Sequence, residues 1–247
     1  MQSNVIKTSL AAVALALAAG APQAAAAAKT FDLPPSADLR YVIKAAQKGL
    51  TLDGEATVKW RAGDGKYTLT SESRASILGK ILENRSEGAV DANGLAPEKF
   101  TEKRFRKDPY TVTFDRVAGT IGFTEGTLSY PIKGGEQDRA SVPWQLAAMA
   151  RATPGKFVPG SELRMFVAGR RDGEPWMFKV AKAEKLRTPM GQLDAVHLVK
   201  APSGDAKDQQ IDIWLAPSHE WYPVKVRFSD NGGDDVVEQI IVKVIKR

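Results

Sequence analysis

The feature that most constrains this chain is a repeated alternation of apolar and polar residues in short segments. Segments 39–45 and 54–60 both alternate, so that Ala56, Val58 and Trp60 share one face of the second segment. Turn residues separate such segments at 63–65, 93–94, 108–109 and 118–119, and the same texture returns over 162–169, 175–186, 192–199, 209–216, 222–228 and 236–245. Many short alternating strands joined by tight turns predict an antiparallel sheet.

The predicted fold class is therefore all-β and mainly antiparallel. We expect a strongly curved sheet, or an unclosed or closed β-barrel-like domain, with one central helix. Residues 29–247 are expected to form a single domain, because the two halves of the chain have the same pattern. Two Pro-Gly pairs indicate that the halves, if they are distinct, join near 152–160.

The first 28 residues have the composition of a secretory signal peptide. A short polar start containing Lys7 precedes an apolar run over 10–19, and small residues follow. The apolar run is shorter than the roughly 20 residues that a membrane-spanning helix needs. We therefore interpret residues 1–28 as a cleaved signal and the remainder as a periplasmic protein with no transmembrane segment.

The chain contains no cysteine. This excludes disulfides, thiolate nucleophiles and cysteine metal ligands, and it also excludes a lipid-attachment cysteine. The mature protein is therefore expected to be soluble and not a lipoprotein.

The net charge is +6 for the whole chain, and removal of Lys7 with the signal leaves 6 − 1 = +5. A basic exported protein favours anionic partners such as lipid head groups, although acidic residues are interspersed throughout. The basic runs 103–107 and 169–171 are typical of solvated strand ends, with contact to phosphate head groups as the alternative. No nucleic-acid motif occurs, so no nucleic-acid partner is expected.

Residues 141–151, SVPWQLAAMAR, interrupt the strand pattern with a predicted helix. Ser141 is a good N-cap, and Pro143 then falls in the first turn, where its missing N–H costs nothing. Trp144 lies nearly opposite the apolar stripe formed by Val142, Leu146, Met149 and Ala150, and beside Ala147 and Ala148. Because neither face is charged, the helix is expected to be covered on both sides.

The run 77–82, ILGKIL, is the second interruption. It has helical spacing behind Ser76 as a cap, but Gly79 disfavours a helix, and an apolar loop is the alternative. Its apolar residues are Ile77, Leu78, Ile81 and Leu82.

The sequence contains no pattern typical of a catalytic site. His197 is expected to be a strand residue with a hydrogen-bonded ring, and His219 a solvated turn residue. Neither has a second histidine at ligand spacing, so no metal site and no cofactor are predicted. Neither a G-x-S-x-G elbow nor an S-x-x-K pair occurs, so no catalytic residue is assigned.

Six stretches resemble an exported bacterial family known as domain of unknown function 3108. They are LRYVIKAAQKGLTLDGEATVKW, EGAVDANGLAPEKFTEKR, GEQDRASVPWQLAAMAR, TPMGQLDAVHLVKA, DQQIDIWLAPSHEWYPVKVRF and VVEQIIVKV. The resemblance implies an envelope location and no established activity. The C-terminal pattern is also similar to the unclosed barrels of Lol-type lipoprotein carriers, in which acyl chains enter between a curved sheet and helices; this is an analogy of architecture.

The leading functional hypothesis is a non-enzymatic periplasmic protein that binds or carries an apolar or amphiphilic, lipid-like ligand. The ligand would lie in the curved sheet against helix 141–151. Its predicted contacts are Trp144 and Ala148 of that helix, with Ile77, Leu78 and Ile81 as a covering segment.

Two further hypotheses remain. One is a structural or interaction module in cell-envelope assembly, in which the helix plugs the sheet and the partner is an envelope protein. The other is a hydrolase of envelope material, for which the sequence supplies no mechanism.

Overall fold

The structure is a computed structural model that describes residues 30–47, 49–200, 209–230 and 235–247. The predicted signal peptide, 1–28, lies outside these ranges. Within them the chain forms sixteen strands, one α-helix and two short 3₁₀ turns. The expectation of an all-β, mainly antiparallel fold with one central helix is confirmed. No helix in the described ranges has the length and apolar character needed to cross a membrane.

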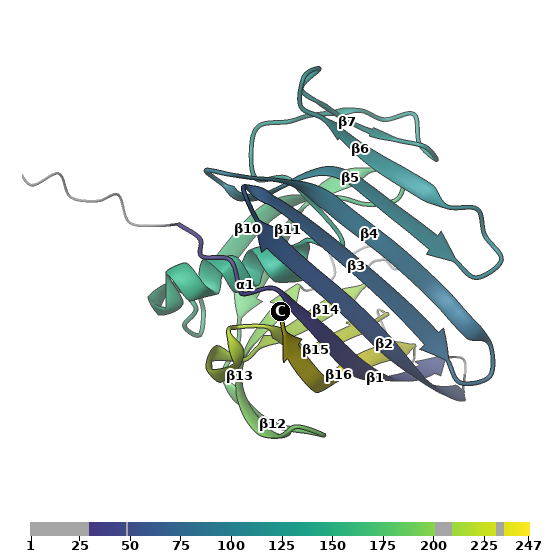
Figure 1. Ribbon diagram of the computed structural model, residues 1–247, viewed down its shortest axis with the longest axis vertical. Coiled ribbons are helices and arrows are strands. Elements are labelled where there is room, and N and C mark those ends of the chain that lie inside the picture. Colours follow the sequence, from purple (N-terminus) through teal and green to yellow (C-terminus); the bar gives the residue numbers. More distant parts are fainter. Residues whose placement is uncertain (1–29, 48, 201–208, 231–234) are drawn as a thin grey trace, which may run out of the picture.

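The N-terminal half is a meander of antiparallel strands (Figure 1). Tight turns join neighbours; at the β2–β3 turn, Asp64 and Gly65 both have positive φ, of 50° and 70°, as a two-residue type I′ hairpin requires. The strands are β1 (Ala37–Gln47), β2 (Leu50–Gly63), β3 (Lys66–Ala75), β4 (Gly79–Asp91), β5 (Gly94–Arg104), β6 (Tyr110–Asp115), β7 (Thr120–Phe123) and β8 (Tyr130–Pro131).

The helix lies between the two halves of the chain. A short strand, β9 (Gln137–Asp138), leads into α1 (Val142–Ala152), which is followed by η1 (Pro154–Lys156). The strands after the helix are β10 (Glu162–Ala168), β11 (Gly173–Val180), β12 (Glu184–Thr188), β13 (Gly191–Lys200), β14 (Gln210–Leu215), β15 (Pro223–Ser229) and β16 (Val236–Lys246), with η2 (Pro217–His219) between β14 and β15.

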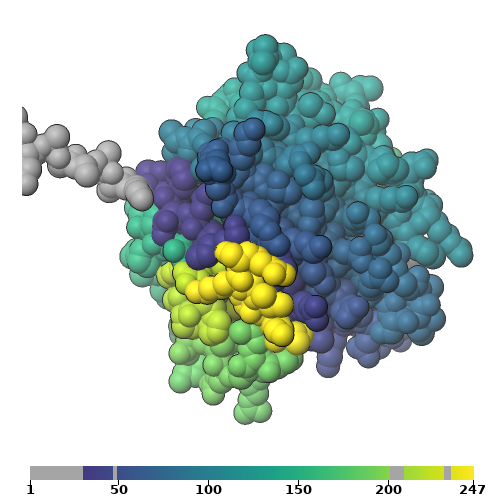
Figure 2. All heavy atoms as spheres, in the orientation of Figure 1, coloured from purple at the N-terminus to yellow at the C-terminus, as the bar shows by residue number. Residues whose placement is uncertain are grey.

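One sheet runs through both halves because the first and last strands pair with each other. β1 is antiparallel to β2 on one side and to β16 on the other, and Figure 2 shows the C-terminal segment (yellow) against the N-terminal one (purple). The order is β8-β7-β6-β5-β4-β3-β2-β1-β16-β15-β14-β13-β11-β10-β9, with β12 beside β13. The sheet is strongly curved but not closed into a barrel.

The two ends of the sheet meet through side chains. Tyr130 of β8 lies against Phe166 of β10, with ring centres 5.2 Å apart, and Gln137 of β9 donates to the carbonyl of Leu95 in β5 at 2.7 Å. The described residues show no backbone ladder between β8 and β9. The curved sheet thus encloses an interior that α1 partly fills.

Helix α1 is buried on both faces, as expected. Val142, Leu146, Ala147 and Ala150 pack in a cluster with β10, β11, β13 and β14. Trp144 belongs to a different cluster, which contains residues of β1–β3 and β15. The helix therefore joins the hydrophobic cores of the two halves.

Three details of the secondary structure differ from the expectations. Of the two alternatives for 77–82, the helix is wrong: Ile77 and Leu78 lie in the β3–β4 turn, and β4 begins at Gly79. The expected strand over 175–186 is divided into β11 and β12. Ser141 is the N-cap residue, but its side chain caps no helical N–H; its hydroxyl bonds the backbone of Asp138 instead.

Candidate functional site: a cavity at the start of the helix

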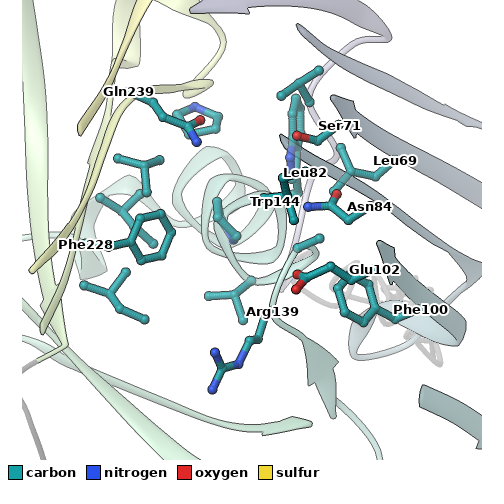
Figure 3. A pocket seen from close by; sticks show the side chains of 18 of the residues that line it. Leu69, Ser71, Leu82, Asn84, Phe100, Glu102, Arg139, Trp144, Phe228 and Gln239 are labelled. Atoms are coloured by element: carbon teal, nitrogen blue, oxygen red, sulfur yellow. The ribbon is translucent and has the colours of Figure 1, made fainter. Parts of the chain in front are cut away.

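A cavity of about 280 Å³ lies inside the curve of the sheet, at the N-terminal end of α1. Residues of β1–β5 form one wall, and residues of β14–β16 form the opposite wall. In Figure 3 the two sets of side chains face each other across the end of the helix. The cavity is thus the part of the sheet interior that α1 leaves unfilled.

Most of the cavity wall is apolar. Because successive side chains of a strand point to opposite faces, alternate large side chains of both halves lie on the concave face of the sheet. The first turn of α1 contributes further apolar side chains to the cavity wall. The principal apolar contacts are Leu69, Phe100, Val142, Trp144, Ile213 and Phe228. A mostly apolar wall with a few polar groups is typical of sites that bind small organic molecules.

A row of polar side chains crosses the concave face of four neighbouring strands. Ser71 of β3 pairs with Asn84 of β4, Asn84 pairs with Glu102 of β5, and Glu102 pairs with Tyr110 of β6. We call Ser71, Asn84, Glu102 and Tyr110 the polar row. Directly opposite residues on neighbouring strands point to the same face, and the first three of them line the cavity.

One member of the polar row has a buried atom without a partner. Asn84 Oδ1 forms no hydrogen bond among the described residues, whereas the Tyr110 hydroxyl lies within hydrogen-bonding reach of Glu102. Burial, and then the negative charge of Glu102, raises the pKa of Tyr110 well above its ordinary value, so its hydroxyl keeps its proton. Because buried polar groups in native proteins nearly always have partners, the row offers unused hydrogen bonds beside the cavity.

Two arginines flank the polar row. Arg104 Nε donates to Glu102 Oε1 at 2.6 Å, and Glu102 is buried, being 7% exposed. Arg139, in the turn before α1, lies over Trp176 with its guanidinium carbon 5.8 Å from the ring centre. Within the described ranges, no acidic side chain forms an ion pair with Arg139. The site thus holds one paired and one unpaired guanidinium.

The predicted ligand contacts of α1 lie in different environments. Trp144 lines the cavity but is also packed: its ring stacks on Trp60 at 4.6 Å between centres and meets the edge of Tyr222 at 6.0 Å. Ala148 is fully buried and does not line the cavity; its carbonyl accepts the N–H of Asp32. Ligand contact by either residue stays a prediction, which the geometry supports for Trp144.

The predicted covering segment does not lie over the helix. Ile77 and Leu78 are 84% and 50% exposed at the tip of the β3–β4 turn, and Ile81 is half-buried in β4. Their neighbour Leu82 does line the cavity. Ligand contact by Ile77, Leu78 and Ile81 stays a prediction that no observation supports.

A second hollow, of about 530 Å³, lies on another side of α1, between Met149, Phe166 and the loop at Gly134. Its acidic group is already satisfied, because Glu136 accepts the backbone N–H groups of Lys133 and Gly134 at 2.6–3.0 Å. The first cavity differs in leaving Asn84 Oδ1 unpartnered, and we therefore regard it as the candidate site.

The histidines lie outside the cavity wall. The His197 ring bonds Asp212 at 2.7 Å and Glu184 at 2.8 Å and stacks on Trp214. Burial alone raises the pKa of Asp212, but hydrogen bonds from His197 and Gln210 outweigh burial and hold it below its ordinary value. His219 lies in η2. The described residues contain no group of three metal-ligating side chains.

The sequence interpretation missed the polar row and Arg139. Serine, asparagine and glutamate in strands usually face solvent, and only the pairing register shows that these residues share the concave face. The available signal was the sequence DRASVPW, which places Arg139 directly before the predicted helix.

Over the residues that the structure describes, fold and site together define a β-barrel-like protein, with a curved, mainly antiparallel sheet, one internal helix and a mostly apolar cavity between them. The chain belongs to the family described as Protein of unknown function (DUF3108), whose model matches residues 40–239. The resemblance seen in the sequence is thereby confirmed. A comparison with curated proteins gives no match.

One solved structure supports the fold. A beta-barrel-like protein of domain of unknown function DUF1849 from Brucella abortus has a TM-score of 0.58 and 15% identity, and covers 88% of this chain and 99% of its own. Two others have low scores. A putative outer membrane lipoprotein-sorting protein domain from Vibrio parahaemolyticus has a TM-score of 0.30, 10% identity and 86% coverage of each chain. A LolA superfamily protein from Nitrosomonas europaea has a TM-score of 0.22 and 10% identity, and the match covers 89% of each chain.

Proposed function

We propose that this protein is a non-enzymatic periplasmic protein that binds or carries an apolar or amphiphilic, lipid-like ligand. The observation that carries the proposal is the cavity at the start of α1, whose wall is mostly apolar and is formed by both halves of the sheet. Its location in the periplasm rests on the signal-peptide composition of residues 1–28.

The size of the cavity supports a small ligand. Its volume of about 280 Å³ is close to the lower limit of ~300 Å³ for small-molecule sites. It is nearly twice the ~150 Å³ of an apolar protein cavity that holds benzene. A single alkyl chain suits this volume better than several chains.

The proposal is tested by filling the cavity. Val226 lines it from β15 and is half-buried, so Val226→Trp places an indole in the space proposed for the ligand. We expect the purified protein to bind dodecanol in calorimetric titrations and Val226→Trp to lose at least tenfold in affinity.

The matched control is Val158→Trp, because Val158 is half exposed and does not line the cavity. It should bind dodecanol as the original protein does, and circular dichroism should show both variants folded. Equal binding by a folded Val226→Trp would contradict the assignment of this cavity.

One observation favours the second candidate, a structural module in envelope assembly. The stack of Trp60, Trp144 and Tyr222 fills much of the sheet interior with the protein's own side chains. That function requires a stable protein partner, which cross-linking in the periplasm would capture irrespective of Val226→Trp.

A further inference from the structure

We propose that the cavity takes a single-chain amphiphile with an anionic oxygen head group. The chain would lie among the apolar side chains beside α1, and the head would lie at the polar row beside Arg139. This inference rests on the proposed function, since it specifies the ligand of the same cavity.

Polarity changes along the cavity wall formed by β1–β5, which we call the N-terminal wall; the opposite wall, formed by β14–β16, is the C-terminal wall. Leu69 of β3 and Phe100 of β5 lie level with the Trp60–Trp144 stack. Two residues further along β3, and two further along β5, come Ser71 and Glu102 of the polar row. This direction leads towards the β3–β4 and β5–β6 turns, so the N-terminal wall becomes polar at that end.

The C-terminal wall is mixed in polarity. Gln209, just before β14, adds a polar group at the same end of the cavity, because the start of β14 lies near the start of β16, which pairs with the end of β1 at Ala46. Phe228 keeps this end partly apolar, and Gln239 is polar level with Ile213. The change from apolar to polar along the cavity is therefore carried by the N-terminal wall, with Gln209 facing its polar end.

The charges select an anionic head. Glu102 is already bonded to Arg104, whereas Arg139 has no acidic partner among the described residues. Two guanidinium groups and one carboxylate leave this end of the cavity with one excess positive charge. A planar guanidinium binds carboxylate or phosphate oxygens through paired hydrogen bonds.

The unused hydrogen bonds agree with this assignment. The side-chain amide of Asn84 points into the cavity in Figure 3, and its buried oxygen has no partner. Since the two ends of an amide are exchanged by a simple flip, Asn84 can present its NH₂ to an anionic oxygen. Fatty-acid carboxylates and the phosphates of single-chain phospholipids share the required chemistry.

The test is a calorimetric comparison of four ligands with the same chain: dodecanoate, dodecyl phosphate, dodecanol and dodecyltrimethylammonium. We expect the two anions to bind at least about tenfold more tightly than the alcohol, the usual gain from a charged hydrogen bond, and the cation to bind most weakly. The tighter anion identifies whether the head is a carboxylate or a phosphate.

The variant Arg139→Gln should weaken binding of both anions about tenfold and leave dodecanol binding unchanged. The matched control is Arg187→Gln, because Arg187 is exposed on β12 and outside the cavity wall; it should change neither. Dodecanol bound as tightly as the anions, or anion binding unaffected by Arg139→Gln, would overturn the anionic head but not the cavity. Failure of all four ligands to bind would overturn the proposed function as well.

Discussion

At the scale of single residues, Asp138 fixes the entry to the helix. It is fully buried; its carboxylate accepts the backbone N–H groups of Ala140 at 2.8 Å and Ser141 at 3.0 Å, and the Ser86 hydroxyl of β4 at 2.5 Å. Burial raises its pKa from 3.8 to about 6, although these hydrogen bonds oppose the shift. The start of α1 is therefore attached to the N-terminal half through an ionisable group.

This group makes stability depend on pH in a defined direction. Because the folded pKa is raised, folded Asp138 holds its proton more tightly than the unfolded chain does. Its contribution to stability is present below about pH 4 and is lost as pH rises to about 6, a change of about 3 kcal/mol. Urea unfolding should show the stability difference between the original protein and Asp138→Asn falling by about this amount from pH 4 to pH 7. A stability difference between the two proteins that stays constant from pH 4 to pH 7 would contradict a raised pKa of Asp138 in the folded protein.

The sequence predicts single residues unevenly. The helix boundary at Ser141 followed from Pro143 and is confirmed, but the Asp138 carboxylate, three residues earlier, accepts backbone N–H groups in the turn before the helix. The position of Trp144 opposite the apolar stripe was predictable from helical spacing. That it stacks on Trp60, over eighty positions away, depends on tertiary packing.

At the scale of elements, α1 is held by a buried polar contact. Gln145 Oε1 accepts the N–H of Leu95 at 2.8 Å, and its Nε2 donates to the carbonyl of Asn93 at 2.8 Å. Both bonds reach the β4–β5 turn, where Gly94 has φ 105° and a Cβ would approach Gln145 Oε1 to 2.4 Å. The turn and the helix therefore fix each other's position.

Gln145→Ala should lower the free energy of unfolding by about 2–3 kcal/mol, because it removes two hydrogen bonds and leaves a buried N–H unpartnered. Urea melts measure this loss. Gln192→Ala is the matched control, since Gln192 is exposed in β13; it should change stability by less than about 0.5 kcal/mol. Equal small losses at both positions would show that Gln145 does not hold the helix.

Strands were predictable from the sequence where the alternation of apolar and polar residues was long, as in β1, β2 and β16. The run 77–82 was ambiguous because its two apolar pairs, 77–78 and 81–82, repeat after four residues, which fits a helix but also fits a turn followed by a strand. Gly79, at φ 70°, supplies the conformation of that turn. Hairpin pairing with β3, in which Gly79 lies opposite Ala75, then decides in favour of a strand.

At the scale of the whole molecule, curvature creates the interior and the β1–β16 pair joins its two walls. Alternation predicted a curved antiparallel sheet with a filling helix. It could not predict the cavity, because register decides which polar residues of β3–β6 share the concave face. The polar row and Arg139 therefore became visible only in the structure.

The central claim is that the cavity holds an alkyl chain, and mass spectrometry of the purified protein tests it most directly. The full chain would be secreted in a Gram-negative host, purified without detergent, denatured and extracted. We predict about one single-chain amphiphile per protein molecule in the extract, and its loss in Val226→Trp but not in Val158→Trp. An extract free of such molecules, from protein that also takes up no added dodecanoate or dodecanol, would contradict the account.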